Sequence, residues 1–445
     1  MKLKIPADVE KILKVLSDGG YEGFAVGGCV RDSVLGREPS DWDITTSAKP
    51  EQVKELFGRT VDTGLQHGTV TVMIGREGYE VTTYRIDGEY LDGRHPKDVV
   101  FTASLEEDLK RRDFTINAMA YHPDRGLVDL FGGMEDLRDG VVRCVGDPLD
   151  RFTEDALRIM RAVRFSAQLG FTIEENTFRA LHVLAPNLRQ VSAERIQAEM
   201  VKLVTSPHPD HLRIAWEAGV TKVFFPEFDE MMETAQNHPH HQYTVGEHAL
   251  HSMLYVPEDK VLRLAMLFHD IGKIRTKTTD EQGIDHFFRH GEQSEILARA
   301  ILRRWKFDND TIAKVKSLCL YHDGMPSATA RSVRKAVNRI GKDLFPLYLQ
   351  VQRADILAQS DYEQEEKLRR LQQVEELYES ILREKQCVTI QELAVTGSDL
   401  IRAGIPAGPE MGRILHFLLE QVLEDPARNT PESLLNLALG YKKSS

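Results

Sequence analysis

The stretch GGCVRDSVLG (residues 27–36), followed by DWD (residues 41–43), decides how the first third of the chain is interpreted. Side chains alternate along a strand, so Asp41 and Asp43 would share one face while Trp42 points to the core. Two adjacent carboxylates repel each other unless a cation lies between them. Hard oxygen ligands with open positions favour Mg²⁺. The pattern therefore predicts a magnesium-assisted in-line displacement at a phosphate.

Two further features favour a nucleotide site beside these aspartates. The pair Gly27 and Gly28 lets the backbone approach a triphosphate without a Cβ in the way. The segments Thr69–Ile74 and Tyr79–Tyr84 alternate in character around a glycine-containing turn, which predicts a hairpin. Glu80 in its second strand is the best-placed third carboxylate. A DxD pair alone is common in surface loops, but its combination with the glycine pair and an Arg-Asp pair is far more specific.

The composition is that of a soluble enzyme with several domains. The chain has 445 residues, is 41% hydrophobic and 28% charged, and carries a formal net charge of −12. That charge argues against non-specific coating of nucleic acid, although local basic patches remain possible. No apolar run is long enough to cross a membrane, the N-terminus lacks a signal peptide, and the four scattered cysteines suit a reducing cytosol. We expect a cytoplasmic protein.

Strand-like segments are confined to about the first third of the chain, and helical periodicity follows. We therefore expect an α+β protein, with a small mixed-sheet head followed by an all-α body. The clearest expected elements are strands at Gly23–Val26 and Trp42–Thr45 and helices at Val9–Leu16, Val261–Phe268 and Asp361–Glu384. Asp147–Pro148 and Phe225–Pro226 are expected as joints between parts of the chain. We expect four regions in all: 1–148, 149–235, 236–362 and 363–445.

A helix is expected to begin near Glu154, with Thr153 as its cap. On that helix Asp155 and Arg158 share a face, and a carboxylate with a guanidinium can match the hydrogen-bonding edge of cytosine or adenine. The alternative is an ordinary ion pair three residues apart, worth a few tenths of a kcal/mol. Arg161 and Arg164 on the same ridge could hold phosphates.

The head of the chain resembles the DNA polymerase beta superfamily, in particular the bacterial and eukaryotic class of tRNA CCA-adding enzymes and poly(A) polymerases. The resemblance continues through RRDFTINA (111–118), DLFGG (129–133), EDALR (154–158) and RAVRF (161–165) in the family's order. It implies Asp41, Asp43 and Glu80 as catalytic residues. It also implies a nucleotide-binding set: Gly28, Arg31, Arg112, Asp113, Asn117, Asp155, Arg158, Arg161 and Arg164.

Weaker marks favour complete CCA addition, with tRNA, ATP and CTP as partners, over poly(A) polymerase activity. LQHGTV (65–70) resembles the CCA enzymes, and residues 87–95 resemble the loop that full CCA enzymes use to switch to ATP. Poly(A) addition and partial addition (A only, or CC only) remain alternatives. The region past about residue 365 is expected to contact tRNA by family analogy alone.

A second site is expected in the helical half, where His269 and Asp270 follow an apolar helix and His248 and Asp355 stand in similar surroundings. Imidazole plus carboxylate suits Mn²⁺, Fe²⁺, Co²⁺, Ni²⁺ or Zn²⁺. The H…HD…D arrangement resembles the HD phosphohydrolase superfamily and implies hydrolysis of phosphoesters, for instance at a damaged RNA 3′ end. His290 and His322 could extend the set, and a hydrogen-bonded core residue is the alternative for His322. The histidine-rich run 237–241 is expected to be loop rather than ligand.

A third reading treats the chain as such a phosphohydrolase with a first half that only binds RNA. The intact Asp41, Asp43, Asp155 and Arg158 argue against it, because a binding relic need not keep metal ligands together with a nucleotide-selecting pair.

Overall fold

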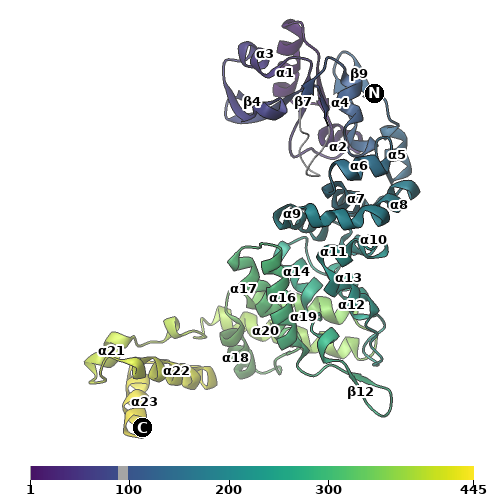
Figure 1. Cartoon of the computed structure of the whole chain (residues 1–445). Coiled ribbons are helices and arrows are strands. Elements are labelled where there is room, and N and C mark those ends of the chain that lie inside the picture. Colours follow the sequence, from purple (N-terminus) through teal and green to yellow (C-terminus); the bar gives the residue numbers. More distant parts are fainter. Residues whose placement is uncertain (1, 89–98, 445) are drawn as a thin grey trace. The chain divides into compact units, whose positions relative to one another are not determined.

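A computed structural model describes residues 2–88 and 99–444 of the chain. The chain forms two compact units, Met1–Pro226 and Glu227–Ser445, each with its own core (Figure 1). The division falls at the joint predicted at Phe225–Pro226. The finer division into four regions stays a prediction.

The head of the first unit contains a seven-stranded mixed sheet, which confirms the α+β class. Its strand order is β3-β4-β5-β2-β1-β8-β9; the β2–β5 pair is parallel and the other neighbours are antiparallel. The strands are β1 (Gly23–Val26), β2 (Ile44–Thr46), β3 (Thr60–Gly64), β4 (Thr69–Ile74), β5 (Glu77–Thr83), β8 (Met119–His122) and β9 (Gly126–Asp129). Shorter pairs join β6 (Arg85–Asp87) to β7 (Val99–Phe101) and β10 (Val141–Val142) to β11 (Thr172–Ile173).

Helices surround this sheet and continue beyond it. The first helix, α1, buries Val9, Ile12, Leu13 and Leu16, the spacing of one helical face, and packs against β1. The helices of the first unit are α1 (Ala7–Asp18), α2 (Gly28–Val34), α3 (Pro50–Leu56), α4 (Leu105–Lys110), α5 (Gly133–Asp139), α6 (Pro148–Glu154), α7 (Leu157–Leu169), α8 (Glu175–Leu184), α9 (Ala193–Val204), α10 (Leu212–Glu217) and α11 (Thr221–Phe224). Short 3-10 helices include η2 (Thr115–Asn117).

The second unit is helical apart from one small hairpin, β12 (Thr278–Thr279) and β13 (Asp285–His286). Helix α14 is buried from Leu262 to Phe268 and packs against α13, α17 and α19, which makes it the centre of this unit. The helices are α12 (Pro226–Glu233), α13 (Val245–Met253), α14 (Lys260–Phe268), α15 (Lys273–Thr276), α16 (His290–Arg304), α17 (Asn309–Tyr321), α18 (Ala330–Ile340), α19 (Phe345–Ala358), α20 (Gln364–Arg383), α21 (Gly397–Arg402), α22 (Pro409–Glu424) and α23 (Pro431–Ser444).

Two local predictions were wrong. The strand expected at Trp42–Thr45 begins at Ile44, so Asp41 and Asp43 precede β2, and Trp42 is only half-buried and lines a surface pocket instead of the core. The helix expected to begin near Glu154 ends there: Thr153 lies inside α6, and α7 starts at Leu157. A proline after a capping Asp147 nucleates the earlier helix, because proline is favoured in a first turn.

All four cysteines, Cys29, Cys144, Cys319 and Cys387, are buried free thiols. Burial raises the pKa of Cys29 and of Cys387 to about 11, and it also raises the pKa values of Cys144 and Cys319. None of the helices formed by residues 2–88 and 99–444 combines the length and apolar character needed to cross a bilayer.

Candidate active sites

The predicted carboxylates converge at one edge of β2. The Val26 N–H donates to the Asp43 carbonyl (3.0 Å), which fixes Asp43 beside the end of β1. The parallel pairing of Ile44 with Val81 places Glu80 on β5 next to Asp43. The side chains of Asp41, Asp43 and Glu80 all reach the surface. Although the aspartates precede the strand, the structure brings together the acids that the sequence predicted.

The pKa of Asp43 is raised in this acidic cluster. Partial loss of water around its carboxyl, together with the charges of Asp41 and Glu80, raises the pKa of Asp43, while Arg112 acts in the opposite direction. Like charges held together disfavour ionisation, and a divalent cation relieves that repulsion. The donor set therefore fits Mg²⁺.

Asp108, which the sequence reasoning missed, positions the arginine of this cluster. Its buried carboxylate accepts hydrogen bonds from Thr45 Oγ1 (2.9 Å) and Arg111 Nη2 (2.8 Å), and Arg112 Nη2 lies 3.5 Å away. Burial alone would raise the pKa of Asp108, but Arg111 and Arg112 outweigh burial and lower it. The sequence indicates this contact, because Asp108 lies three residues before Arg111 and four before Arg112, and these positions share a helical face.

The glycine pair leaves the backbone open beside the carboxylates. Gly27 has a φ of 83°, in the left-handed region, and a Cβ there would lie 3.1 Å from Arg112 Nη1. A Cβ at Gly28, the first residue of α2, would meet only Arg31 within 4 Å. A phosphate could therefore approach this backbone closely.

A chain of buried hydrogen bonds links the predicted nucleotide-binding residues. Arg31 Nη1 donates to Asn117 Oδ1 (2.7 Å), Asn117 Nδ2 donates to Asp113 Oδ1 (3.2 Å), and Arg161 Nε donates to Asp113 Oδ2 (2.7 Å). Burial would raise the pKa of Asp113, but Arg161 and Arg158 outweigh burial and lower it to about 2. Asp113 is thus ionised and fixes the position of Arg161 through an ion pair.

The DLFGG motif (129–133) packs against η2, the short helix that contains Asn117 of this hydrogen-bond network. The Asp129 carboxylate accepts the N–H groups of Gly133 and Met134, both at 2.8 Å. A Cβ at Gly133 would lie 2.4 Å from the Thr115 carbonyl oxygen, so only glycine lets α5 pack against η2. Because η2 ends at Asn117, this close approach fixes one of the residues predicted to bind the nucleotide.

Asp155 and Arg158 do not form the ion pair considered as the alternative. Asp155 lies in the break between α6 and α7, where its carboxylate accepts the Leu157 N–H (3.0 Å) and a hydrogen bond from Arg195 (2.8 Å). Arg158 donates to Glu154 (2.6 Å) and to the Arg111 carbonyl (3.0 Å). Both side chains are therefore held by neighbours and not by each other.

The two remaining arginines of α7 differ in their surroundings. Arg161 is about one-third exposed and faces Asp113. The Arg164 side chain is 7% exposed, forms an ion pair with Glu199 on α9, and stacks over the Phe165 ring at 3.8 Å. A phosphate could reach Arg164 only by displacing Glu199, so its environment is that of a packed support.

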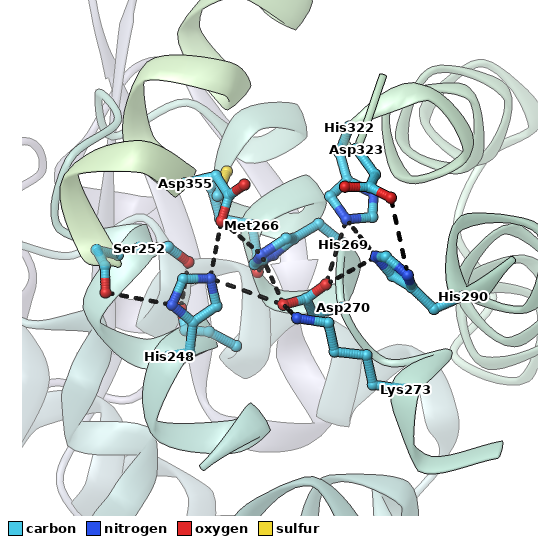
Figure 2. Close-up of polar contacts among 12 residues, drawn as sticks. His248, Ser252, Met266, His269, Asp270, Lys273, His290, His322, Asp323 and Asp355 are labelled. Atoms are coloured by element: carbon cyan, nitrogen blue, oxygen red, sulfur yellow. Dashed lines mark hydrogen bonds and ion pairs between the residues drawn. The ribbon is translucent and has the colours of Figure 1, made fainter. Parts of the chain in front are cut away.

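In the second unit, side chains from α13, α15, α16 and α19 and from adjoining turns meet around Asp270 (Figure 2). His248 Nε2 lies 2.9 Å from Asp355 Oδ1 and 3.7 Å from Asp270 Oδ2. His269 Nε2 lies 3.5 Å from Asp270 and 3.6 Å from Asp355, longer than a normal hydrogen bond. All four predicted ligands are thus brought together.

The backbone fixes which nitrogen each histidine presents to this cluster. Carbonyl oxygens only accept hydrogen bonds, so each Nδ1 that contacts one carries the hydrogen and leaves Nε2 as a metal ligand. The Nδ1–carbonyl contacts are His248–Ala358 (3.3 Å), His269–Met266 (2.7 Å), His290–Phe287 (2.8 Å) and His322–Cys319 (2.7 Å). The histidines are therefore preset for coordination.

His290 and His322 lie in the same cluster as the four predicted ligands. Their Nε2 atoms are 3.1 Å apart and lie 3.3 Å and 3.2 Å from Asp270 Oδ1. With both Nδ1 atoms protonated, two neutral imidazoles would face each other with lone pairs, a repulsive contact that a cation relieves. Two ligand groups, His248/His269/Asp270 and Asp270/His290/His322, thus share one carboxylate.

Cationic groups keep the acids of this cluster ionised. Burial would raise the pKa of Asp270, but the nearby Lys273, at 2.7 Å, and His269 hold it well below its usual range. The adjacent His248 and His269 hold the pKa of Asp355 well below its usual range despite burial. The histidine-rich run 237–241 is loop, as predicted, yet His238, His240 and His241 line the cavity beside the cluster.

Three family models match successive parts of the chain. A family model described as poly A polymerase head domain matches residues 23–143, one described as probable RNA and SrmB-binding site of polymerase A matches 170–232, and one for tRNA nucleotidyltransferase domain 2 matches 275–438. The CCA-adding enzyme of Leuconostoc mesenteroides is 35% identical over 98% of this chain and 96% of its own length. This chain belongs to the CCA-adding enzyme family.

Solved members of the CCA-adding enzyme family share the architecture. The Bacillus stearothermophilus CCA-adding enzyme in complex with CTP is 30% identical, covers 99% of both chains and superposes with a TM-score of 0.75. The Thermotoga maritima CCA-adding enzyme complexed with tRNA is 21% identical, covers 98% of this chain and 96% of its own, and has a TM-score of 0.61, a similarity of fold.

Two segments were predicted as marks of the CCA-adding enzymes, residues 87–95 and LQHGTV (65–70). Most of the segment 87–95, predicted as the switching loop, lies outside the described residues. The LQHGTV stretch forms the short helix η1 (Leu65–His67) and the start of β4, and Arg85 Nη1 donates to the His67 carbonyl (2.5 Å).

Proposed function

We propose that this chain adds C, C and A to the 3′ end of tRNA from CTP and ATP. The observation that carries the proposal is the convergence of Asp41, Asp43 and Glu80 at the end of β2, with Arg112 and the open Gly27–Gly28 backbone beside them. Membership of the CCA-adding enzyme family supports the choice of substrates. The buried free thiols support the cytoplasmic location expected from the sequence.

In this proposal Asp41 and Asp43 hold Mg²⁺, with Glu80 completing the acidic face. When bound, Mg²⁺ supplies charge neutralisation and activation of the attacking hydroxyl. The Gly27–Gly28 backbone and Arg112 orient the triphosphate, and Arg31, Asp113 and Asn117 surround the nucleotide. The tRNA 3′-oxygen bonds to the α-phosphorus and its proton passes to solvent, the bond from the α-phosphorus to the β-phosphate breaks, and pyrophosphate leaves. We assign no protein general base.

Nucleotide choice is proposed to rest on Asp155 and Arg158. A carboxylate accepts from the amino group of cytosine or adenine, and a guanidinium donates to a ring acceptor. Because Arg195 holds Asp155 and Glu154 holds Arg158, both side chains are already oriented by neighbours before a base arrives. Arg161 is proposed to contact phosphate, and the region past about residue 365 to contact tRNA.

The decisive experiment supplies the protein with tRNA lacking its last three nucleotides, with CTP, ATP, both or neither, and sizes the products. We expect growth by two nucleotides with CTP and by three with both. Extension with ATP alone, continuing past one residue, would instead identify a poly(A) polymerase. Growth that stops after CC, or that needs CC already present, would identify a partial enzyme.

A second activity is favoured by the histidine cluster. We propose that His248, His269, Asp270 and Asp355 hold a divalent metal (Mn²⁺, Fe²⁺, Co²⁺, Ni²⁺ or Zn²⁺) and that His290 and His322 with Asp270 hold another. When bound, such ions activate water and polarise a phosphoester. In hydrolysis of a 2′,3′-cyclic phosphate, water oxygen bonds to phosphorus, one ester bond breaks, and the released ribose oxygen takes up a proton. This would repair damaged RNA 3′ ends.

This activity is tested with adenosine 2′,3′-cyclic phosphate, first with chelator-treated protein and then with each metal added back. Hydrolysis that needs added metal and is lost in Asp270→Asn, with CCA addition intact, would support the proposal. Absence of hydrolysis with all five metals would contradict it.

A further inference from the structure

A cavity of about 460 Å³ leads outward from the histidine cluster of the second unit. Its lining includes Asp270, His290 and His322 of the cluster, together with His286 and Phe288. A volume of this size is typical of sites for small organic ligands. A phosphate and a water molecule bound at the histidine cluster would fill only part of this cavity. The rest of the cavity has space for the organic group that carries the phosphate.

Phe288 is the unexpected residue of this wall. Its side chain is 73% exposed, the highest exposure among the exposed large hydrophobic residues that the structure describes. Its ring stacks on His286 with ring centroids 5.5 Å apart and an angle of 9° between the rings. The Asp280 carboxylate holds the His286 Nε2 at 2.8 Å, which fixes the pair. Most of the Phe288 ring surface stays open for another flat group.

The chain geometry couples this aromatic pair to the cluster. His286 ends the hairpin strand β13, and His290 is the first residue of α16. Between Phe288 and His290, Arg289 has a φ of 58°, a left-handed conformation that non-glycine residues seldom adopt. This turn lets His290 point to Asp270 while Phe288, two residues earlier, remains at the surface.

Cationic side chains in the same cavity match the charge of a phosphate ester. Lys273 Nζ lies 2.7 Å from Asp270 Oδ2 and donates to Gln236 Oε1 (2.8 Å). Lys367 on α20 donates to Gln359 Oε1 (2.6 Å) and lies 3.1 Å from His240 Nδ1. The cavity therefore combines a cationic part that suits a phosphate with an aromatic part that suits a base.

We infer that the stacked Phe288–His286 pair is a platform for a nucleobase, so that this site takes phosphate esters of nucleosides in preference to phosphate esters without a base. Bases stack on aromatic side chains whatever their hydrogen-bonding pattern, so the platform discriminates nucleosides from other esters and not one base from another. The inference rests on the proposed phosphohydrolase function. The nucleoside could be a free mononucleotide or the last residue of an RNA.

The test compares two substrates of the metal-loaded full-length protein: adenosine 2′,3′-cyclic phosphate and 1-O-methylribose 2,3-cyclic phosphate, which lacks a base. For Phe288→Ala we expect KM for the adenosine ester to rise about tenfold, the effect of losing one stacked base, with kcat and the base-free ester unchanged. Phe288→Tyr should restore the original KM. Tyr255→Ala removes another exposed aromatic side chain, outside the cavity, and should change neither substrate.

Equal effects on both substrates, or no effect, would overturn the platform. A tRNA ending in a 2′,3′-cyclic phosphate forms a third arm: a KM far below that of the mononucleotide would identify an RNA end as the source. If the wild-type protein hydrolyses nothing, the phosphohydrolase proposal fails, and calorimetric binding of adenosine 2′-monophosphate still decides the platform. Any binding of adenosine 2′-monophosphate in the head is the same in the wild type and in Phe288→Ala. Weaker binding by Phe288→Ala than by the wild type would therefore support the platform, and equal binding would overturn it.

Discussion

The two sites of this chain hold their acids in opposite ways. In the head, Asp41, Asp43 and Glu80 reach the surface, and like charges with partial loss of water raise the pKa of Asp43. In the helical unit, Asp270 and Asp355 are surrounded by imidazoles and Lys273, and their pKa values are held well below the usual range.

The contrast indicates two modes of metal use. An exposed acidic edge, with repulsion left in place, suits an ion that comes and goes with its triphosphate, since substrate phosphates complete the coordination of Mg²⁺. Buried imidazoles with preset tautomers suit a resident ion, because the protein itself supplies most ligands.

Replacing Asp43 with alanine should lower nucleotide addition at least about 1,000-fold, equivalent to about 4 kcal/mol of barrier, because a charge facing the reacting phosphate is lost. Product sizing on the shortened tRNA measures this. Binding of tRNA and hydrolysis by the second unit should persist. Glu77→Ala, an exposed acid on the same strand as Glu80, is the matched control and should retain activity. Turnover retained by Asp43→Ala would remove the residue from the mechanism.

The second prediction concerns metal content. Purified, manganese-loaded protein should hold two ions in the second unit, and His290→Ala should hold one, because the group of Asp270, His290 and His322 loses a ligand while His248 and His269 remain. Mass spectrometry of the metals after gel filtration measures the ratio. His416→Ala, an exposed histidine on α22, should leave it unchanged. A wild-type protein with no retained metal would contradict the resident mode.

The third change tests whether Arg164 on α7 stabilises the fold through its ion pair with Glu199. Glu199→Gln leaves the buried Arg164 unpaired, and breaking a buried ion pair typically costs about 3–5 kcal/mol of unfolding free energy. Urea denaturation should show this loss. Glu175→Gln removes an exposed partner of Arg179 and should cost at most about 0.5 kcal/mol. Similar values for both variants would mean that Arg164 is not a packed support.

The smallest effect concerns pH. The pKa of Asp113 is about 2 in the fold, below its ordinary value of 3.8, so the group stabilises the fold above about pH 4. That contribution, about 2 kcal/mol, is lost as pH falls through about 2. Asp113→Asn should therefore be less stable at neutral pH and flatten the acid slope. Urea denaturation monitored by hydrogen exchange in α7 measures the slope. An unchanged slope would show that Arg161 and Arg158 do not hold the carboxylate ionised.

Much of the fold follows from periodicity within the sequence. The strand Gly23–Val26 was predicted with its observed limits, and Val261–Phe268 and Asp361–Glu384 correspond to α14 and α20. The errors at Trp42 and Thr153 arose where local preferences conflict with distant contacts. Asp155, for example, is drawn out of a helical conformation while Arg195, far along the chain, holds its carboxylate.

The sites were predictable only in part, for the same reason. Motifs marked the acids and histidines, since metal chemistry restricts residue types. Glu199 and Phe288 carry no motif, and Asp108 is marked only by its spacing to the two arginines that follow it. The contacts that define two of these residues come from distant segments: Thr45 on β2 donates to Asp108 on α4, and Arg164 on α7 pairs with Glu199 on α9. The importance of Phe288 lies in its exposure, which no local pattern of residues specifies.

The four buried cysteines have a practical consequence. Only the thiolate reacts readily with alkylating reagents, and burial raises the pKa of all four thiols. A cysteine introduced at an exposed position would therefore be modified far faster than any natural one. The native sequence can thus serve as its own unreactive background for attaching a single fluorophore or spin label, without first replacing Cys29, Cys144, Cys319 or Cys387.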